Sequence, residues 1–145
     1  MVNLSENRRA RYDYTILDTF EAGIVLSGHE TKSAKVGMMQ LAGSYAIVKN
    51  NHAYLLGAHI PSFQPRNAPP EYDPSRTRVL LLHKKEIARL VGALNEKGTS
   101  LIPLRAYTKR GFVKIELGLA RARKKADKRE LLKTRAVERE MRSNE

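Results

Sequence analysis

The strongest constraint on the fold is a period-two pattern near the end of the chain. Residues 112–119 read FVKIELGL, in which large apolar residues alternate with other types, as in a β-strand that buries one face. Residues 101–108 form a second strand-like segment, and residues 109–111 separate the two. A three-residue connection that contains glycine is typical of a tight hairpin. The pattern therefore predicts an antiparallel β-hairpin.

A second hairpin is predicted in the first half of the chain. Residues 44–48 and 53–60 flank a short polar connection that contains Asn50 and Asn51. Asparagine tolerates the left-handed backbone that a tight turn requires. The two segments are therefore expected to pair with each other.

Two more strands are predicted before this hairpin. Residues 12–20 are rich in Tyr, Thr, Ile and Phe, which fit a pleated, half-buried surface. Residues 21–26 fit either a helical turn or more strand. Residues 30–36 alternate polar and small types, and this alternation favours another strand.

The middle of the chain predicts a loop and then one helix. Five of the six prolines lie within residues 61–74, where fixed φ angles and missing N–H groups disfavour regular structure. This segment is expected to be an extended surface loop. Apolar residues then recur from Ile87 to Leu94 at the spacing i, i+3, i+4, i+7, and Gly98 marks a stop. One amphipathic helix is therefore expected to pack on the sheet.

These elements predict a mainly β fold with few helices. About six strands and one long inserted helix suit an oligonucleotide-binding (OB)-like barrel better than a parallel sheet with crossover helices. We expect this barrel to span residues 1–120 of the 145-residue chain. Residues 121–145 hold ten basic and five acidic residues without glycine or proline, so they predict a basic tail that is disordered alone and becomes helical on a partner.

The charge balance restricts the kind of partner. Lys and Arg number 27 against 15 Asp and Glu, for a net charge of +12, which favours nucleic acid because bound cations release counterions from phosphates. The absence of cysteine excludes disulfides and thiolate sites, and the four histidines lack metal-ligand spacing, so neither a metal nor another cofactor is expected. The longest apolar runs are far too short to span a bilayer, and the first residues do not resemble a secretory signal. We therefore expect a cytoplasmic protein with no membrane partner.

Several basic segments and tyrosines could form the nucleic-acid surface. The cations include Arg9 in the first segment, the pair Lys32 and Lys35, and the hairpin tip Lys109–Arg110. Phosphate contact combined with base stacking is typical of RNA recognition, although for each tyrosine alone core packing is the better interpretation. The tyrosines concerned are Tyr12, Tyr14, Tyr45 and Tyr107. Glu30 can be read as an exposed ion pair, as an aid that orients Lys32, or as an acceptor from a base edge or ribose hydroxyl.

Six ordered segments of the sequence are similar to one known family. They read NRRARYDY, FEAGIVLSGHETKSAKVG, AHIPSF, DPSRTRVLLLHKKEI, KGTSLIPLRAY and GFVKIELGLARARKKADKRE, and together they extend over about residues 7–130. In this order the segments resemble the SsrA-binding protein family, also called small protein B. The resemblance implies an OB-type barrel that binds the tRNA-like domain of transfer-messenger RNA.

The same resemblance implies the biological process. Members of this family deliver transfer-messenger RNA to stalled ribosomes for trans-translation, which rescues the ribosome and tags the incomplete peptide for degradation. The implied ribosomal contacts are the decoding centre and messenger channel of the small subunit. Alanyl-tRNA synthetase and elongation factor Tu are implied as indirect partners through the RNA. The family has no active site, so the chain is not expected to be an enzyme.

The matching positions identify the expected contact residues. The RNA-facing set is Asn7, Arg8, Arg11, Glu30, Lys32, Ser33, Lys35, Arg76, Arg78, His83 and Lys84. Lys35 is included because it forms a basic pair with Lys32. The ribosome-binding set of the tail is Arg123, Lys124, Lys125, Asp127, Lys128, Arg129 and Lys133. Two positions depart from the family pattern, since Ala126 and Val137 stand where the family usually has stacking residues.

Two other interpretations remain open from the sequence. One keeps the barrel but makes the protein a constitutive ribosomal component or a general single-strand binder. The other is a small RNA-modifying or hydrolytic enzyme that uses His83 and Glu30, which requires these two side chains to converge. We expect a monomer, because no segment shows a second apolar face.

Overall fold

The computed structural model describes residues 1–64, 70–124, 129, 132 and 135. Within them, seven strands and three helices follow one another along the chain. Their bounds are β1 (Val2–Glu6), α1 (Arg8–Asp13), β2 (Tyr14–Ile24), α2 (Gly28–Lys35), β3 (Tyr45–Lys49), β4 (His52–Leu56), β5 (Arg78–Leu81), α3 (Lys84–Leu94), β6 (Thr99–Lys109) and β7 (Phe112–Ala122).

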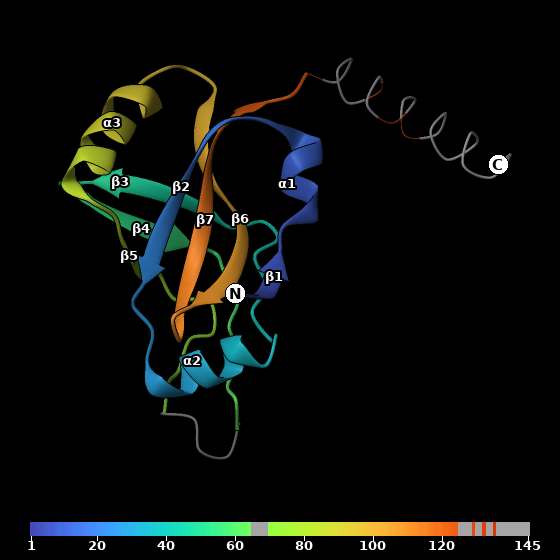
Figure 1. The fold of residues 1–145 in the computed structure, drawn as a ribbon, viewed down its shortest axis with the longest axis vertical. Helices are drawn as coiled ribbons and strands as arrows, with labels where there is room; N and C mark the ends of the chain where they lie inside the picture. Colours follow the sequence, from blue (N-terminus) through green and yellow to red (C-terminus); the bar gives the residue numbers. More distant parts are fainter. Residues whose placement is uncertain (65–69, 125–128, 130–131, 133–134, 136–145) are drawn as a thin grey trace, which may run out of the picture.

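The strands form one antiparallel sheet that curls back on itself (Figure 1). The order is β1-β6-β3-β4-β5-β2-β7, and β7 also pairs with β6. Six strands therefore form a ring, with β1 added at β6. The ring is joined weakly at one place, because β3 pairs with β6 only through Ala46 and Leu101. This arrangement confirms the predicted mainly β, OB-like fold class and adds one strand to the expected number.

Both predicted hairpins are present. The turn between β3 and β4 places Asn50 at φ 52° and Asn51 at φ 62°, the left-handed region expected for these asparagines. The turn between β6 and β7 does the same with Arg110 at φ 52° and Gly111 at φ 82°. The predicted amphipathic helix is α3, whose Leu90 is fully buried in the core.

The prediction of a strand over residues 30–36 is wrong, because most of this segment belongs to helix α2. Ser27 caps the helix, and the Glu30 side chain accepts a hydrogen bond from the Ser27 N–H at 3.0 Å. This reciprocal capping box satisfies N–H groups that the first turn would otherwise leave without partners. Two further elements were not predicted: β1 pairs with β6, and α1 packs Ala10 against the outer side of β6 and β7.

Strand β7 extends past the expected end of the barrel. It continues through Ala122, and the Arg123 N–H then donates to the Asp13 carbonyl at 2.8 Å. This hydrogen bond joins the end of α1 to the residue that follows β7, past the expected barrel end at Ala120. Four of the predicted tail residues, and the two positions that depart from the family pattern, lie outside the described residues: Lys125, Asp127, Lys128, Lys133, Ala126 and Val137.

Among the described residues, no helix is long and apolar enough to cross a membrane.

Candidate RNA interface

Glu30 lies at the centre of a buried polar cluster between α2 and the segment that leads into β5. Its Oε2 accepts hydrogen bonds from Arg78 Nε at 2.9 Å and Nη2 at 2.7 Å. Arg76 donates through Nε to the same oxygen at 3.0 Å and through Nη2 to Oε1. The Tyr72 hydroxyl donates to Oε2 at 3.1 Å. The side chains of Glu30 and Arg78 are both fully buried.

The charge of Glu30 is maintained by its partners. Burial opposes ionisation of the carboxyl, but hydrogen bonds from Arg76, the Ser27 backbone and Arg78 outweigh this effect and lower the pKa of Glu30 to about 2. Burial, followed by the nearby Glu30 charge, raises the pKa of Tyr72 above its usual value. Glu30 is therefore an anion, and Tyr72 remains a neutral donor, across the physiological range.

The cluster also fixes the backbone around it. Arg78 donates through Nη1 to the Ala58 carbonyl at 2.8 Å and through Nη2 to the Pro74 carbonyl at 2.9 Å. The Tyr72 hydroxyl lies 2.7 Å from the Ile60 carbonyl oxygen. Both ends of the proline-containing loop are thus tied to α2 through one carboxylate.

Burial of four predicted contact residues corrects the expectation that they face a partner. Glu30 and Arg78 use their polar groups inside the cluster, and Ser33 is fully buried on the inner side of α2. Asn7 is 6% exposed, and its side-chain amide donates to the Pro103 carbonyl at 3.0 Å. Since these polar groups lie inside the protein, they are not accessible to an RNA at the surface of this conformation. Glu30 orients Arg76 and Arg78 rather than Lys32.

The other predicted contact residues lie at the surface, but in three separate places. Arg8 and Arg11 on α1 have side chains that are 92% and 60% exposed. Lys32 and Lys35 are exposed on α2, where the side chain of Arg76 is 38% exposed. His83 and Lys84 are exposed at the start of α3. Figure 1 shows α1, α2 and α3 at different positions around the sheet, so the structure does not gather these residues into one site.

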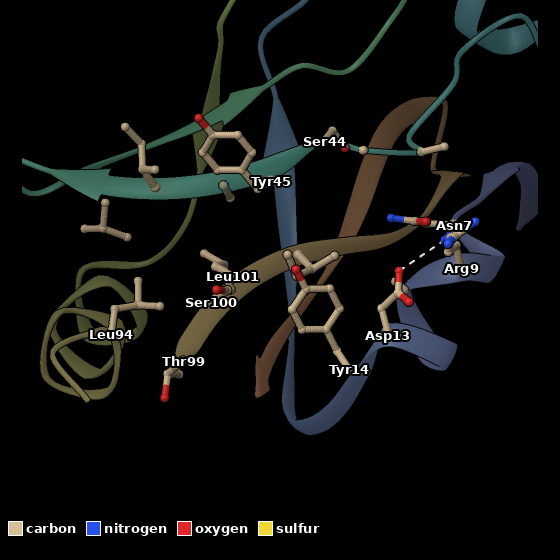
Figure 2. Close-up of a pocket in the computed structure, with 17 residues that line it drawn as sticks. Asn7, Arg9, Asp13, Tyr14, Ser44, Tyr45, Leu94, Thr99, Ser100 and Leu101 are labelled. Carbon is tan, nitrogen blue, oxygen red and sulfur yellow. Dashed lines mark hydrogen bonds and ion pairs between the residues drawn. The ribbon is translucent and has the colours of Figure 1, made fainter. Parts of the chain in front are cut away.

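A groove between α1 and β3 brings together residues that the sequence did not combine. It has a volume of about 610 Å³, and Tyr14 and Tyr45 are among the residues that line it (Figure 2). Arg9 lies at its edge, 3.3 Å from the Asp13 carboxylate. The groove is located where β3 and β6 pair through a single residue pair. The sequence indicates both tyrosines as stacking candidates, but their proximity depends on a long-range strand arrangement that sequence spacing does not reveal.

The remaining tyrosine candidates differ in burial. Tyr12 is half-buried on α1, whereas Tyr107 is 3% exposed. Burial and a hydrogen bond to Glu21 raise the pKa of Tyr107. Tyr107 therefore has the core-packing role that the sequence favoured.

The arrangement does not support a catalytic pair of Glu30 and His83. The Glu30 oxygens are occupied by Ser27, Tyr72, Arg76 and Arg78, whereas His83 begins α3 at the other end of the sheet (Figure 1). Among the described residues, no group of three His, Asp or Glu side chains could hold a metal ion. Within the described residues, the geometry provides exposed cations and aromatic surface.

Comparison with known proteins identifies the family. The model of the SmpB protein family matches residues 4–145. The chain is 49% identical over 140 residues to the SsrA-binding protein of Coprothermobacter proteolyticus, covering 96% of this chain and 93% of the relative. It is also 49% identical over 138 residues to the SsrA-binding protein of Thermosynechococcus vestitus, covering 95% and 91% of the two chains.

A solved structure agrees with this match. This structure carries the description "tmRNA-SmpB: a journey to the center of the bacterial ribosome". One of its chains is similar to this fold, with a TM-score of 0.68. The two chains are 45% identical, and the alignment covers 83% of this chain and 84% of the other. The sequence, the fold and these matches lead to one conclusion: the chain belongs to the SmpB protein family.

Proposed function

We propose that this protein binds the tRNA-like domain of transfer-messenger RNA (SsrA) and delivers it to stalled ribosomes for trans-translation. The observation that carries the proposal is the match to SsrA-binding proteins over nearly the whole of both chains. The solved tmRNA-SmpB structure of the bacterial ribosome supports the same pair of partners. Ribosome rescue and tagging of the incomplete peptide for degradation follow from this role.

The proposed RNA surface consists of the exposed cations. Lys32 and Lys35 are the best candidates for phosphate contact, because neither forms an ion pair within the part of the chain that the structure describes. Among the described residues, Arg8 pairs with Glu6 at 3.9 Å and Arg11 pairs with Glu116 at 3.7 Å, and such long, exposed pairs are weak. His83 and Lys84 complete the surface at the start of α3.

The buried members of the predicted set act through other residues. Glu30 holds the guanidinium of Arg76 in a fixed position, and the Arg76 side chain remains partly exposed. A phosphate therefore meets a preorganised guanidinium. Arg78 supports the same carboxylate from inside, and Asn7 joins the start of α1 to β6. Ser33 lies on the side of α2 that faces the protein interior. Loss of these groups affects RNA binding through the shape of the surface.

The tail and the cellular setting complete the proposal. Arg123, Lys124 and Arg129 belong to the basic segment that we assign to the decoding centre and messenger channel of the small ribosomal subunit. Alanyl-tRNA synthetase and elongation factor Tu act on the RNA and meet this protein only through it. The protein works in the cytoplasm as a binding factor without a catalytic step of its own.

A competition titration tests this function. The protein is titrated with the tRNA-like domain of transfer-messenger RNA at near-physiological salt, with ordinary tRNA and a single-stranded oligonucleotide as competitors. Tight binding that neither competitor displaces supports the proposal. Equal, weak and salt-sensitive binding to all three RNAs contradicts it and leaves a general RNA-binding barrel.

A further inference from the structure

A second hollow, smaller than the groove between α1 and β3, lies beside α1. It has a volume of about 360 Å³ and is lined by four arginines together with Glu6, Asn7 and Leu104. The four arginines are Arg8, Arg11, Arg105 and Arg135. They come from α1, from β6 and from the basic tail, so the fold brings together charges from three distant parts of the sequence. We call this site the arginine hollow.

The packing of α1 places two of these arginines beside β6. Ala10 is buried against β6 and β7, which fixes the side of α1 that faces the sheet. Arg8 and Arg11 are three positions apart and therefore lie on one side of the helix. The Asn7 side chain donates to the Pro103 carbonyl at 3.0 Å and holds the start of α1 against β6 (Figure 1).

Arg105 is the fixed member of the arginine hollow. Its Nε donates to Glu116 Oε2 at 3.3 Å, and its Nη1 donates to Asn3 Oδ1 at 2.8 Å. Its guanidinium carbon lies 4.4 Å from the centre of the Tyr107 ring, within the range of a cation–π contact. Because these three contacts hold the guanidinium, Arg105 contributes a charge of fixed position.

The charges of the other three arginines are poorly compensated. Among the described residues, Arg8 pairs with Glu6 only at 3.9 Å, and Arg135 forms no ion pair. Arg11 lies 3.7 Å from Glu116, a carboxylate that already binds the fixed arginine of β6. Four guanidinium groups therefore meet two carboxylates, an excess of two positive charges. Because arginine does not lose its proton in proteins, a bound anion is the means by which this repulsion is relieved.

The size and lining of the hollow favour phosphate groups that lie close together. A guanidinium presents paired N–H donors that match two oxygens of one phosphate. Neighbouring phosphates of a polyphosphate share a bridging oxygen, whereas a ribose separates them in RNA, so a polyphosphate concentrates more charge in a small volume. The lining residues that the structure describes include no aromatic ring on which a base could stack. A short polyphosphate therefore fits the arginine hollow better than a nucleobase or a segment of RNA backbone.

We propose that the arginine hollow binds a short polyphosphate, either inorganic or part of a nucleoside polyphosphate, and that the bound anion joins the tail to the barrel through Arg135 and Arg11. The inference goes beyond the proposed function, because the RNA-binding role does not require a small-molecule ligand. It is tested without RNA, so its failure leaves the proposed function standing, and failure of that function leaves this site to be judged by itself.

Isothermal titration calorimetry tests the site, with inorganic tripolyphosphate added to the full-length protein at near-physiological salt and without divalent cations. The wild type should bind one tripolyphosphate per chain with a saturable heat. Arg11→Ala and Arg135→Ala should each weaken binding by about 10-fold or more, because each removes charge-assisted hydrogen bonds to phosphate. Arg11→Lys should recover only part of the loss, since an ammonium lacks the paired donors of a guanidinium.

Arg9→Ala is the matched control, because it removes the same charge from the same helix. The Arg9 side chain is 79% exposed, pairs with Asp13 at 3.3 Å and lines the groove towards β3 instead of the arginine hollow. Its removal should leave the affinity for tripolyphosphate within about 2-fold of the wild type, since salt screens a charge outside the site. Far-ultraviolet circular dichroism and the thermal midpoint establish that each variant is folded, and Arg8→Ala replaces Arg11→Ala if the latter does not fold.

Two further ligands identify the group that is recognised. A nucleoside triphosphate should bind about as tightly as tripolyphosphate, because both present a chain of phosphates to the arginines. A nucleoside monophosphate should bind much more weakly. Equal affinity for the monophosphate and the triphosphate would overturn the inference, and so would binding of the nucleoside triphosphate without binding of tripolyphosphate, because recognition would then depend on a single phosphate or on the base.

Limited digestion with trypsin tests the connection to the tail. If the anion joins Arg135 to α1, saturating tripolyphosphate should slow cleavage within residues 125–145 of the wild type several-fold. Arg11→Ala at the same tripolyphosphate concentration should be cleaved at its ligand-free rate, and this comparison also controls for an effect of polyphosphate on the protease.

Different results overturn the two parts of the inference. The site is overturned by an absence of saturable binding in the wild type or by wild-type affinity in both Arg11→Ala and Arg135→Ala. It is also overturned by an equal loss of affinity in Arg9→Ala, which would indicate a response to net charge alone. Wild-type affinity in Arg135→Ala alone, or tail cleavage at an unchanged rate in the saturated wild type, overturns the joining of tail to barrel.

Discussion

Arg78 donates two hydrogen bonds to a single oxygen of Glu30, at 2.7 and 2.9 Å, although 48 residues separate them in the sequence. Neither side chain is exposed to solvent. Isolated charges are costly to bury, so this pair depends on mutual compensation and on the additional donors Arg76, Tyr72 and Ser27. The pair therefore connects α2 to β5 at the base of the proposed RNA surface.

Removal of the carboxylate should strongly destabilise the protein. Glu30→Ala leaves the Arg78 guanidinium buried without its counter-ion, which should lower the free energy of unfolding by about 3–5 kcal/mol. Chemical denaturation measures the change. The control is Glu96→Ala, because the Glu96–Arg121 pair is exposed at both side chains and should contribute within about 0.5 kcal/mol. Equal stability of the two variants would contradict the anchoring role of Glu30.

The same carboxylate predicts a loss of stability in acid. The pKa of Glu30 is about 2 in the folded protein and 4.5 for the free group, so the unfolded chain takes up the proton first. The stabilisation, on the order of 3 kcal/mol, is complete above pH 4.5 and is lost as the pH falls from about 4.5 to about 2.

Unfolding midpoints measured between pH 2 and pH 6 test this prediction. Glu30→Gln should have a flatter profile than the wild type in this range, because it lacks the titrating group. Parallel profiles for the two proteins would show that other carboxyl groups cause the acid sensitivity.

The elements that the sequence predicted correctly depend on local signals. Asn50–Asn51 and Arg110–Gly111 mark their turns because these residues adopt positive φ, and α3 follows from apolar spacing within one helix. Helix α2 also has a local signal, since Ser27 and Glu30 have the spacing of a capping box. The alternation of polar and small residues indicates a strand instead, and in the folded chain the cap prevails over that alternation.

The features that the sequence could not predict depend on distant contacts. Strand β1 pairs with an edge that β6 offers far along the chain, as in the pair Val2–Thr108. Glu30 is expected at the surface because carboxylates are rarely buried without partners, and its partners lie 46 and 48 residues later. Composition indicated an RNA-binding surface, but only the fold separates exposed lysines from structural arginines.

Lys32 and Lys35 should contribute to RNA binding through charge. A Lys32→Ala/Lys35→Ala variant should bind the tRNA-like domain more weakly, and its log affinity should depend less steeply on log salt by about one unit for each phosphate that is no longer neutralised. Arg78 is unsuitable for this test because it is buried in the ion pair.

The matched control for the lysine variant is Lys97→Ala, an exposed cation in the turn after α3. It should retain the wild-type affinity and salt dependence. An unchanged salt slope in the lysine variant would place the phosphate-binding cations elsewhere on the surface.

The last prediction separates the barrel from the tail, and the structure decides where the chain should be cut. Truncation after Lys124 keeps all of β7 and the Arg123 hydrogen bond to Asp13. This variant should bind the tRNA-like domain with nearly wild-type affinity but should fail to support peptide tagging in a reconstituted stalled-translation assay, because the segment assigned to the decoding centre is missing.

Truncation after Ala120 removes more than the tail. It deletes the pairs Tyr14–Ala122 and Thr15–Arg121, together with the hydrogen bonds that Arg123 donates to Asp13 and Tyr14. The start of β2 then has no neighbouring strand, so this shorter variant should unfold at lower denaturant concentration than the Lys124 truncation. Loss of RNA affinity in the Lys124 truncation, with unfolding unchanged, would mean that the tail itself binds the RNA and that the two tasks are not divided between barrel and tail.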